Sequence, residues 1–355
     1  MDYAIVVIIR QPMQQTAANK RIQFWIGILV SIGCLAAIFV FIKPAEILAA
    51  LKNTRYELWT MAALTLVLFL VLRAIRWRYM INSGLENGNV AYSSVFHIQN
   101  IGYMLTNILP FRLGDVARAV LIGNVPPATI SLGLSTMVVE RIFDLLFIVI
   151  LFPFTVAGVE RLPPEIKTVA MVTGLLAILA ALVMGGAANK RQSAIKVAEF
   201  ILNRIPFLDT KTWLRRLDDL LRGLDVLTSF RSAMTLIFLT IVVWLPIIVG
   251  YYIGMRAVNL ETNLVEAAFV VCIAALSITA PSSPGQVGVY EAGVTFAIAS
   301  ILGLPEGQAA SFAFLNHAVN YVIIGILGII GITRTGETFG SVIQSTRSLV
   351  RSRTE

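Results

Sequence analysis

The stretch NILPFRLGDVAR, from Asn107 to Arg118, carries three charges between two apolar flanks. The charges belong to Arg112, Asp115 and Arg118, and a proline and a glycine interrupt the stretch. A single charge at the centre of a bilayer costs roughly 2.5–3.5 kcal/mol on insertion scales. Three charges within seven residues should therefore not face lipid. The segment lies either outside the bilayer or buried in protein with partners for its charges.

A second stretch repeats this design and favours burial. It reads PSSPGQVGVYE, from Pro281 to Glu291. When Pro110 is aligned with Pro284, a glycine follows four residues later in both stretches and an acid soon after it. Prolines and glycines at these places predict breaks in the membrane helices. The predicted breaks are Pro110, Gly114, Pro281, Pro284, Gly285 and Gly288.

The composition is that of an integral membrane protein. Of the 355 residues, 57% are hydrophobic and 14% are charged, against about 25% charged in soluble domains. The net charge of +8 is better explained by basic loops beside membrane spans than by nucleic acid, which is not an expected partner. Two cysteines and two histidines, without ligand spacing, predict no metal site and no disulfide. No phosphate-binding loop motif occurs, so neither ATP nor any other cofactor is expected.

Apolar runs predict an all-α polytopic bundle of about six full spans and two opposed re-entrant helical hairpins. The arms on either side of Pro110 and of Pro284 are too short for the roughly 20 residues of a full crossing. The predicted division is a tail at 1–23, a first membrane half at 24–187 with a hairpin at 95–121, a basic loop at 188–232, a second half at 233–333 with a hairpin at 264–302, and a tail at 334–355.

The distribution of basic residues predicts that both termini are cytoplasmic, in a plasma membrane. Nineteen Lys and Arg fall in the predicted inner segments and six in the outer ones. Arg73, Arg76 and Arg78 are counted with the inner group, because they end a span and are expected to extend towards the cytoplasm. Under this topology the first hairpin enters from the cytoplasm and the second from outside.

The two halves also match in the span that follows each hairpin. Glu140 and Asp144 come 30 and 34 residues after Pro110, while His317 and Asn320 come 33 and 36 residues after Pro284. Paired, interrupted apolar segments in two halves are typical of inverted-repeat transporters with a site at the midplane.

Three blocks of residues, in order along the chain, resemble a known family. They are PFRLGDVAR from Pro110, ERIFD from Glu140 and PxxPGxxGxxE from Pro281. They look like the signature blocks of the lysylphosphatidylglycerol synthase transmembrane family, which is flippase-like, and the resemblance runs from about residue 24 to 332. Asp115 departs from the glutamate common in the family, and aminoacylation of a lipid is not expected, because an aminoacyl-transferase domain would need about 300 further residues. The resemblance implies lipid translocation, with phospholipid, polyprenyl-lipid and hopanoid pathways all open.

Nine residues are predicted to bind the substrate: Arg112, Asp115, Arg118, Glu140, Arg141, Asp144, Glu291, His317 and Tyr321. Arg112 and Arg118 would hold a lipid phosphate through bidentate charge-assisted hydrogen bonds. The structural alternative is that they only neutralise neighbouring acids.

The acids and the histidine also have two interpretations each. Glu140 and Asp144 share one helix face and suit a cationic head group, a proton or a salt-bridge cluster, and Arg141 is assigned mainly to the last. Glu291 is predicted to contact a head group or a coupling ion, with pairing to an arginine as the alternative. His317 is either a hydrogen-bonded packing residue or a proton carrier, with Tyr321 one turn away as its partner.

The predicted function is ATP-independent movement of an anionic or phosphate-bearing amphiphilic lipid between leaflets, by a transporter and not an enzyme. Three alternatives stay open: a secondary transporter of a small soluble ion or metabolite, an intramembrane enzyme acting on lipid, and a non-catalytic partner of a lipid-modifying enzyme. A homo-oligomer is compatible with each of them.

Overall fold

Helices make up the described part of the chain. The computed structural model describes residues 17–109, 113–160, 162–189, 191–203, 214, 229–279 and 282–344, and no strand occurs in these ranges. The predicted all-helical class is therefore confirmed for them. Pro110, Arg112 and Pro281, with much of the predicted basic loop at 188–232, lie outside the described residues.

The elements follow the apolar runs of the sequence. In chain order they are α2 (Ala17–Phe41), α3 (Pro44–Lys52), α4 (Tyr56–Ser83), α5 (Tyr92–Ile108), α6 (Leu113–Gly123), α7 (Ile130–Ala157), α8 (Pro164–Asn189), α9 (Arg191–Leu202), α11 (Phe230–Ala257), α12 (Leu264–Ser277), the 3-10 turn η3 (Pro284–Gln286), α13 (Val289–Thr295), the π-helical turn η4 (Phe296–Ile301) and α14 (Glu306–Thr335).

Several described helices are suited to a bilayer. By length and composition, α4, α11 and α14 can each cross a membrane, and a bent pair of Ile28–Val40 with α3 makes a fourth if it forms one span. Large apolar side chains such as Leu64, Phe238 and Ile329 stay exposed on these helices. A soluble surface would not carry so many, so these faces suit lipid. The protein is a multi-pass helical membrane protein, and the predicted total of six spans stays a prediction.

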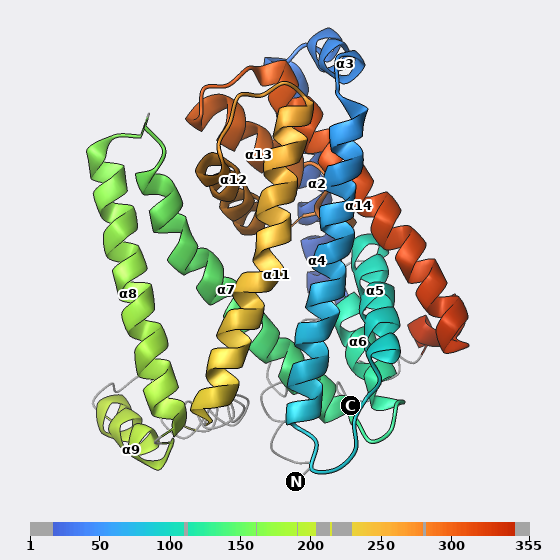
Figure 1. Ribbon diagram of the computed structural model, residues 1–355, viewed down its shortest axis with the longest axis vertical. Helices are drawn as coiled ribbons and strands as arrows, with labels where there is room; N and C mark the ends of the chain where they lie inside the picture. The colour runs from blue at the N-terminus through green and yellow to red at the C-terminus, as the bar shows by residue number, and fades with distance from the viewer. Residues whose placement is uncertain are drawn as a thin grey trace.

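Two short helix pairs lie at opposite ends of the long helices. Figure 1 shows α4 and α11 side by side along the middle, with α5 and α6 towards the lower end and α12 and α13 towards the upper end. Helix α14 descends from the upper end and packs along α5. That these pairs are re-entrant hairpins stays a prediction.

The last turn of α5 meets the break before α13 inside the molecule. A Cβ atom at Gly285 would lie 2.9 Å from the carbonyl oxygen of Asn107, at the end of α5, and would overlap the Tyr321 hydroxyl of α14. Gly285 also has a φ of 72°, a conformation that side-chain-bearing residues rarely adopt. Gly288, with a φ of 89°, lies against the carbonyl of Ser31 in α2. Glycine thus allows the end of α5, the break before α13 and a neighbouring helix to converge.

Two large apolar cores support this meeting point. One joins α7, α11, α12, α13 and α14 around Phe269 and Phe312, and the other joins α4, α5, α6 and α7 around Trp77. The site lies between them.

Candidate functional site

Five charged side chains from three helices form a buried arginine cluster. Arg73 and Arg76 come from α4, Arg118 from α6, and Glu140 and Asp144 from α7. Arg76, Arg118 and Glu140 are each 1% exposed. Since burying unpaired charges is very unfavourable, the cluster must be held by its internal pairs.

Asp144 pairs with two arginines of the cluster and Glu140 with all three, Arg76 being the most distant at 3.8 Å. Arg73 donates from Nε to Glu140 Oε1 at 2.8 Å and from Nη2 to Asp144 Oδ2 at 2.8 Å. Arg118 Nη2 lies 2.9 Å from Glu140 Oε2, and Arg76 Nη1 lies 2.8 Å from Asp144 Oδ1. The cluster therefore ties α4, α6 and α7 together.

Helical spacing explains why these groups converge. Arg73 and Arg76 are three residues apart on α4, and Glu140 and Asp144 are four apart on α7, so each pair shares one helix face. Arg118 reaches the cluster past Gly102 of α5, where a Cβ atom would overlap the arginine side chain. Gly102, which sequence reasoning did not identify, thus gives Arg118 its path.

Aromatic side chains surround the cluster. The Arg118 guanidinium lies 4.1 Å from the centre of the Trp77 ring, and Tyr103 faces the guanidinium groups of both Arg73 and Arg118. Trp244 donates from Nε1 to Asp144 Oδ1 at 3.2 Å. Aromatic faces attract cations, and they keep water away from the charges.

The cluster holds one more positive charge than negative charge, because three arginines meet two carboxylates. Three of its buried nitrogens, Nε and Nη2 of Arg76 and Nε of Arg118, have no hydrogen-bond partner within the described part of the chain. The adjoining pair of Arg141 and Asp115, at 2.9 Å, is neutral and does not change this excess. The cluster is therefore suited to receive an anion.

The structure corrects one prediction about α4. Arg73 and Arg76 do not extend towards a membrane surface, because both turn inward to the acids of α7. Only Arg78 stays half-buried at the flank, donating to the Val90 carbonyl at 2.9 Å. Without those two arginines, 17 basic residues remain in the predicted inner segments against six outside. The three-residue spacing of Arg73 and Arg76, which puts both on one face of α4, was the sequence signal that could have indicated their inward position.

A second polar cluster lies where α13 meets α14. His317 Nδ1 is 2.5 Å from Glu291 Oε1, and Glu291 Oε2 accepts from the Gly288 backbone N–H at 2.6 Å. Asn316 donates to the Tyr290 hydroxyl at 2.6 Å, which in turn lies 2.7 Å from the Tyr251 hydroxyl. The alternative that Glu291 pairs with Arg118 does not occur.

This Glu291–His317 pair corresponds to the arginine cluster in the other half. In each half, a charged residue just after the break contacts the next long helix: Arg118 of α6 binds Glu140 of α7, and Glu291 of α13 binds His317 of α14. The correspondence extends the matched pattern of the sequence to matched contacts.

A central cavity of about 230 Å³ connects the two clusters. Its lining includes Arg73 of the arginine cluster, Tyr290 and His317 of the second polar cluster, Asn107 near the end of α5 and Gln286 of η3. Apolar and aromatic side chains of α4, α11 and α12 complete the wall. The cavity combines a few polar groups with a mainly apolar wall, as ligand sites do.

Eight of the nine predicted site residues lie in or beside the arginine cluster and the Glu291–His317 pair. His317 faces the cavity, while Arg118, Glu140, Asp144 and Glu291 stand behind its lining. Asp115 and Arg141 pair beside the cluster, where Arg141 has a side chain 47% exposed, and the Tyr321 ring packs edge-on against His317. Arg112 lies outside the described residues. Sequence reasoning missed Arg73, Arg76, Tyr290 and Asn316.

Within the described residues, no group of three or more His, Cys, Asp or Glu side chains could hold a metal ion. The chemistry that the site offers is therefore charge pairing and hydrogen bonding by arginine, histidine and amide groups.

Comparison with known proteins finds relatives of low sequence identity. Over 345 residues it is 23% identical to glycosyltransferase AglD of Haloferax volcanii, covering 88% of this chain but only 54% of AglD. It is also 23% identical to UPF0104 membrane protein MJ1595 of Methanocaldococcus jannaschii, covering 85% of this chain and 92% of that protein. A UPF0104 membrane protein of Methanothermobacter thermautotrophicus is 21% identical, with 88% and 95% covered.

No solved structure matches the chain. The family model described as the lysylphosphatidylglycerol synthase TM region matches residues 24–328, which is most of the sequence. The blocks around Asp115, Glu140 and Glu291 all fall inside this match, and the chain belongs to the lysylphosphatidylglycerol synthase transmembrane family.

Proposed function

We propose that this protein moves an amphiphilic lipid with a phosphate-bearing head group between the leaflets of a cell membrane, without ATP. The observation that carries the proposal is the excess positive charge of the arginine cluster beside the central cavity. An anionic head group entering next to Arg73 would neutralise that charge. A neutral solute would leave the excess charge in place.

The proposed membrane arrangement has about six spans and two re-entrant hairpins, with both termini in the cytoplasm. The positions of α5–α6 and α12–α13 at opposite ends, with the end of α5 meeting the break near Gly285, support this inverted repeat. The site would then lie near the bilayer midplane, where such repeats place their substrates.

The size of the cavity supports transport of the head group alone. A volume of about 230 Å³ is below the roughly 300–1,000 Å³ of sites that enclose a whole drug-sized ligand. A phosphate with a small polar substituent is the part of a lipid that such a volume can take. The acyl chains would stay in the surrounding lipid while the head group crosses.

Reconstituted liposomes test the proposal. Phosphatidylcholine vesicles would contain a trace of phosphatidylglycerol carrying a fluorescent label on one acyl chain, and externally added dithionite would bleach only lipid that reaches the outer leaflet. The wild type is expected to expose the inner pool. Arg73→Gln removes the charge that lines the cavity and should slow exposure by about tenfold.

Two further variants separate transport from stability. Asn320→Leu adds an apolar side chain to the cavity wall without touching the arginine cluster, and it should also slow exposure. Arg256→Gln removes an exposed arginine at the end of α11 and serves as the charge-matched control. The proposal would be refuted if labelled lipid were exposed at the same rate in protein-free vesicles and in vesicles containing the wild type or any of the variants.

A second candidate function comes from the relative AglD, which is named a glycosyltransferase. Because the chain spans about half of AglD, it could instead serve as the membrane part or partner of a lipid-modifying enzyme. Incubation of the vesicles with the purified protein, followed by mass spectrometry of the lipids, distinguishes the two. Unchanged lipid masses with rapid exchange favour translocation, and a converted lipid favours enzymatic action.

A further inference from the structure

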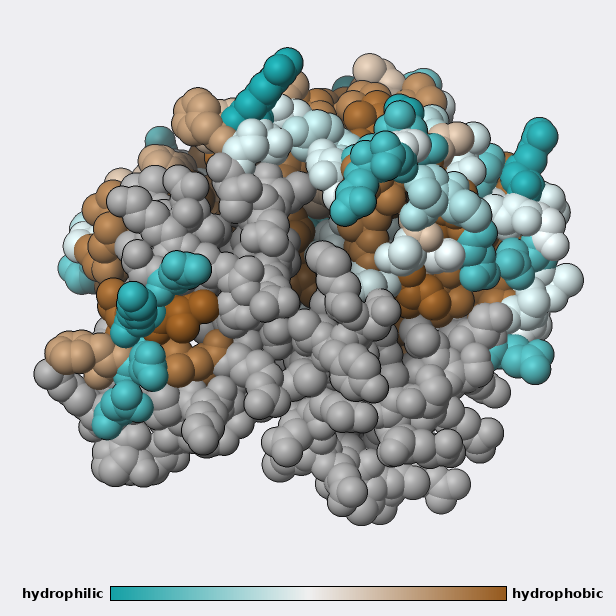
Figure 2. All heavy atoms as spheres, turned by 90° about the horizontal axis from the view of Figure 1, so that it is seen from below, coloured by the Kyte–Doolittle hydropathy of each residue, from teal (hydrophilic) through white to brown (hydrophobic). Residues whose placement is uncertain are grey.

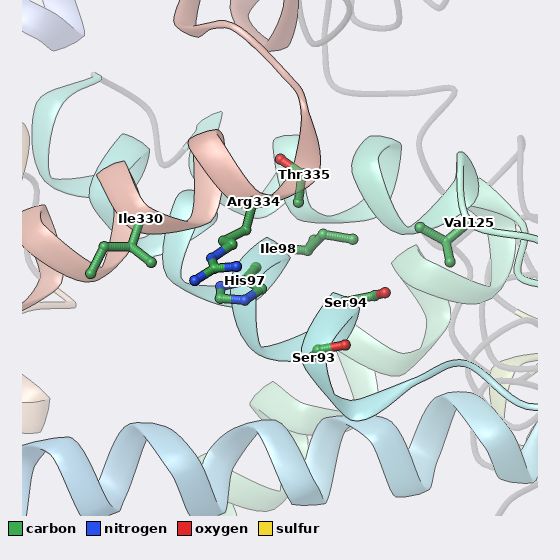
Figure 3. A pocket seen from close by; sticks show the side chains of 8 residues that line it. All are labelled: Ser93, Ser94, His97, Ile98, Val125, Ile330, Arg334 and Thr335. Atoms are coloured by element: carbon green, nitrogen blue, oxygen red, sulfur yellow. The ribbon is translucent and has the colours of Figure 1, made fainter.

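A second, larger cavity opens between the start of α5 and the end of α14. Its volume is about 620 Å³, and its lining shares no residue with that of the central cavity. Its polar lining consists of Ser93, Ser94, His97, Arg334 and Thr335. Figure 3 shows the Arg334 side chain extending from the last turn of α14 beside the His97 ring, with both serines on the first turns of α5.

Close packing of α14 on α5 brings these groups together. A Cβ atom at Gly331 would lie 2.8 Å from the carbonyl oxygen of His97, and one at Gly328 would lie 2.7 Å from the Met104 sulfur. The two glycines therefore let α14 run unusually near α5. Arg334 follows Gly331 by three residues and so reaches the same side of α14 as this contact.

Polar groups that line this cavity lack hydrogen-bond or ion-pair partners among the described residues. No carboxylate of a described residue lies within ion-pair distance of Arg334, which is exposed. His97 Nδ1 is buried and has no hydrogen-bond partner within the described ranges. Partial positive charge at the start of α5 adds to the charge of Arg334, because the 17-residue helix has no side-chain cap.

Apolar side chains lie next to these donors. Ile98, Val125 and Ile330 form the rest of the cavity lining. The face of the molecule seen from below shows hydrophilic and hydrophobic described side chains side by side (Figure 2). A free phosphate ion has no use for an apolar wall, whereas a lipid presents a phosphate and apolar chains together. Basic pockets between membrane helices are a known way of holding anionic head groups.

We propose that this cavity is a second lipid site, which holds the phosphate group of an anionic phospholipid at the membrane surface between α5 and α14. The Arg334 guanidinium would bind two phosphate oxygens, and the Ser93 and Ser94 hydroxyls would donate to the others. The site lies outside the proposed transport cavity. A lipid bound here would clamp α14 to the first arm of the α5–α6 pair.

Native mass spectrometry of the full-length, delipidated protein tests this site. Dioleoyl phosphatidylglycerol is titrated into the detergent-solubilised protein, and the number and affinity of bound lipids are compared between variants. Arg334→Gln is expected to weaken one binding event by about tenfold, since it removes the only charged donor among the described lining residues. The double variant Ser93→Ala, Ser94→Ala should weaken the same event several-fold.

Controls identify the location and the source of the ligand. Arg256→Gln changes the net charge equally at the other end of the bundle and should bind lipid like the wild type. Arg73→Gln should retain this binding event even if it abolishes transport, so the two proposals can fail separately. Equal binding by Arg334→Gln and the wild type would overturn the site. Millimolar glycerol 3-phosphate is added as a competitor of the lipid. If it displaces the lipid and the displacement depends on Arg334, the cavity is assigned to a soluble phosphate ester and the lipid assignment is overturned.

Discussion

Neutralising Glu140 should destabilise the protein more than any exposed charge change. Glu140 accepts from Arg73 and lies 2.9 Å from Arg118 Nη2, and it is 1% exposed. Glu140→Gln keeps the shape but leaves three buried arginines with one carboxylate. Removing one partner of a buried ion pair costs about 3–5 kcal/mol. The amide oxygen still accepts one hydrogen bond, so we expect the lower end, about 3 kcal/mol.

Thermal unfolding in detergent, followed by size-exclusion chromatography of the remaining folded protein, measures this loss. A decrease of about 3 kcal/mol corresponds to a fall in Tm of roughly 5 °C. Glu261→Gln, in the exposed loop before α12, is the matched control and should change stability by about 0.5 kcal/mol or less.

A double variant tests the electrostatic origin of the effect. Glu140→Gln combined with Arg118→Gln restores the original excess of one positive charge. The double variant should therefore be less destabilised than the sum of the two single variants. If the stability losses of the two single variants simply added, or if Glu140→Gln were as stable as the Glu261→Gln control, the destabilisation would not come from the excess positive charge of the cluster.

Two packing predictions follow from the same region. Gly285→Ala should lower Tm, because its Cβ would overlap the Tyr321 hydroxyl and its φ is 72°. Adding Tyr321→Phe should recover only the part due to the hydroxyl, because the Tyr321 Cζ atom at 2.5 Å and the Asn107 carbonyl oxygen at 2.9 Å would remain. Complete recovery would show that backbone strain contributes nothing. Trp77→Phe should cost roughly 3 kcal/mol, because Trp77 is fully buried and stacks with Arg118, whereas Trp25→Phe, at a site 61% exposed, should cost far less. Equal losses at the two tryptophans would contradict the role of the stack.

The ion pairs of Arg73 also affect how a ligand can bind in the central cavity. Arg73 both lines the cavity and bridges Glu140 and Asp144, so any ligand that binds it competes with those acids. A head-group phosphate would have to loosen one of these contacts to bind fully. Under the proposed function, uptake and release of the lipid would exchange protein carboxylates for the ligand phosphate at Arg73.

The sequence by itself determined the class of protein and the break around Gly285 and Gly288, whereas Gly114, also predicted as a break, lies inside α6. Long apolar runs require a membrane, since no soluble surface accommodates them, and they became helices as predicted. The glycines at 285 and 288 signalled interrupted helices because only glycine adopts their backbone angles readily. The pairing of Glu140 with Asp144 on one face followed from their four-residue spacing alone.

Only the tertiary structure decided which charges share a site. An arginine near the end of a membrane helix can reach the membrane surface or turn into the protein, and its own helix does not determine which. Arg73 and Arg76 turn inward because packing rotates α4 towards Glu140 and Asp144, which lie about 70 residues away along the chain. Likewise, His317 meets Glu291 only because α13 packs against α14. Contacts between distant segments depend on helix rotation and depth, and local sequence patterns do not contain that information.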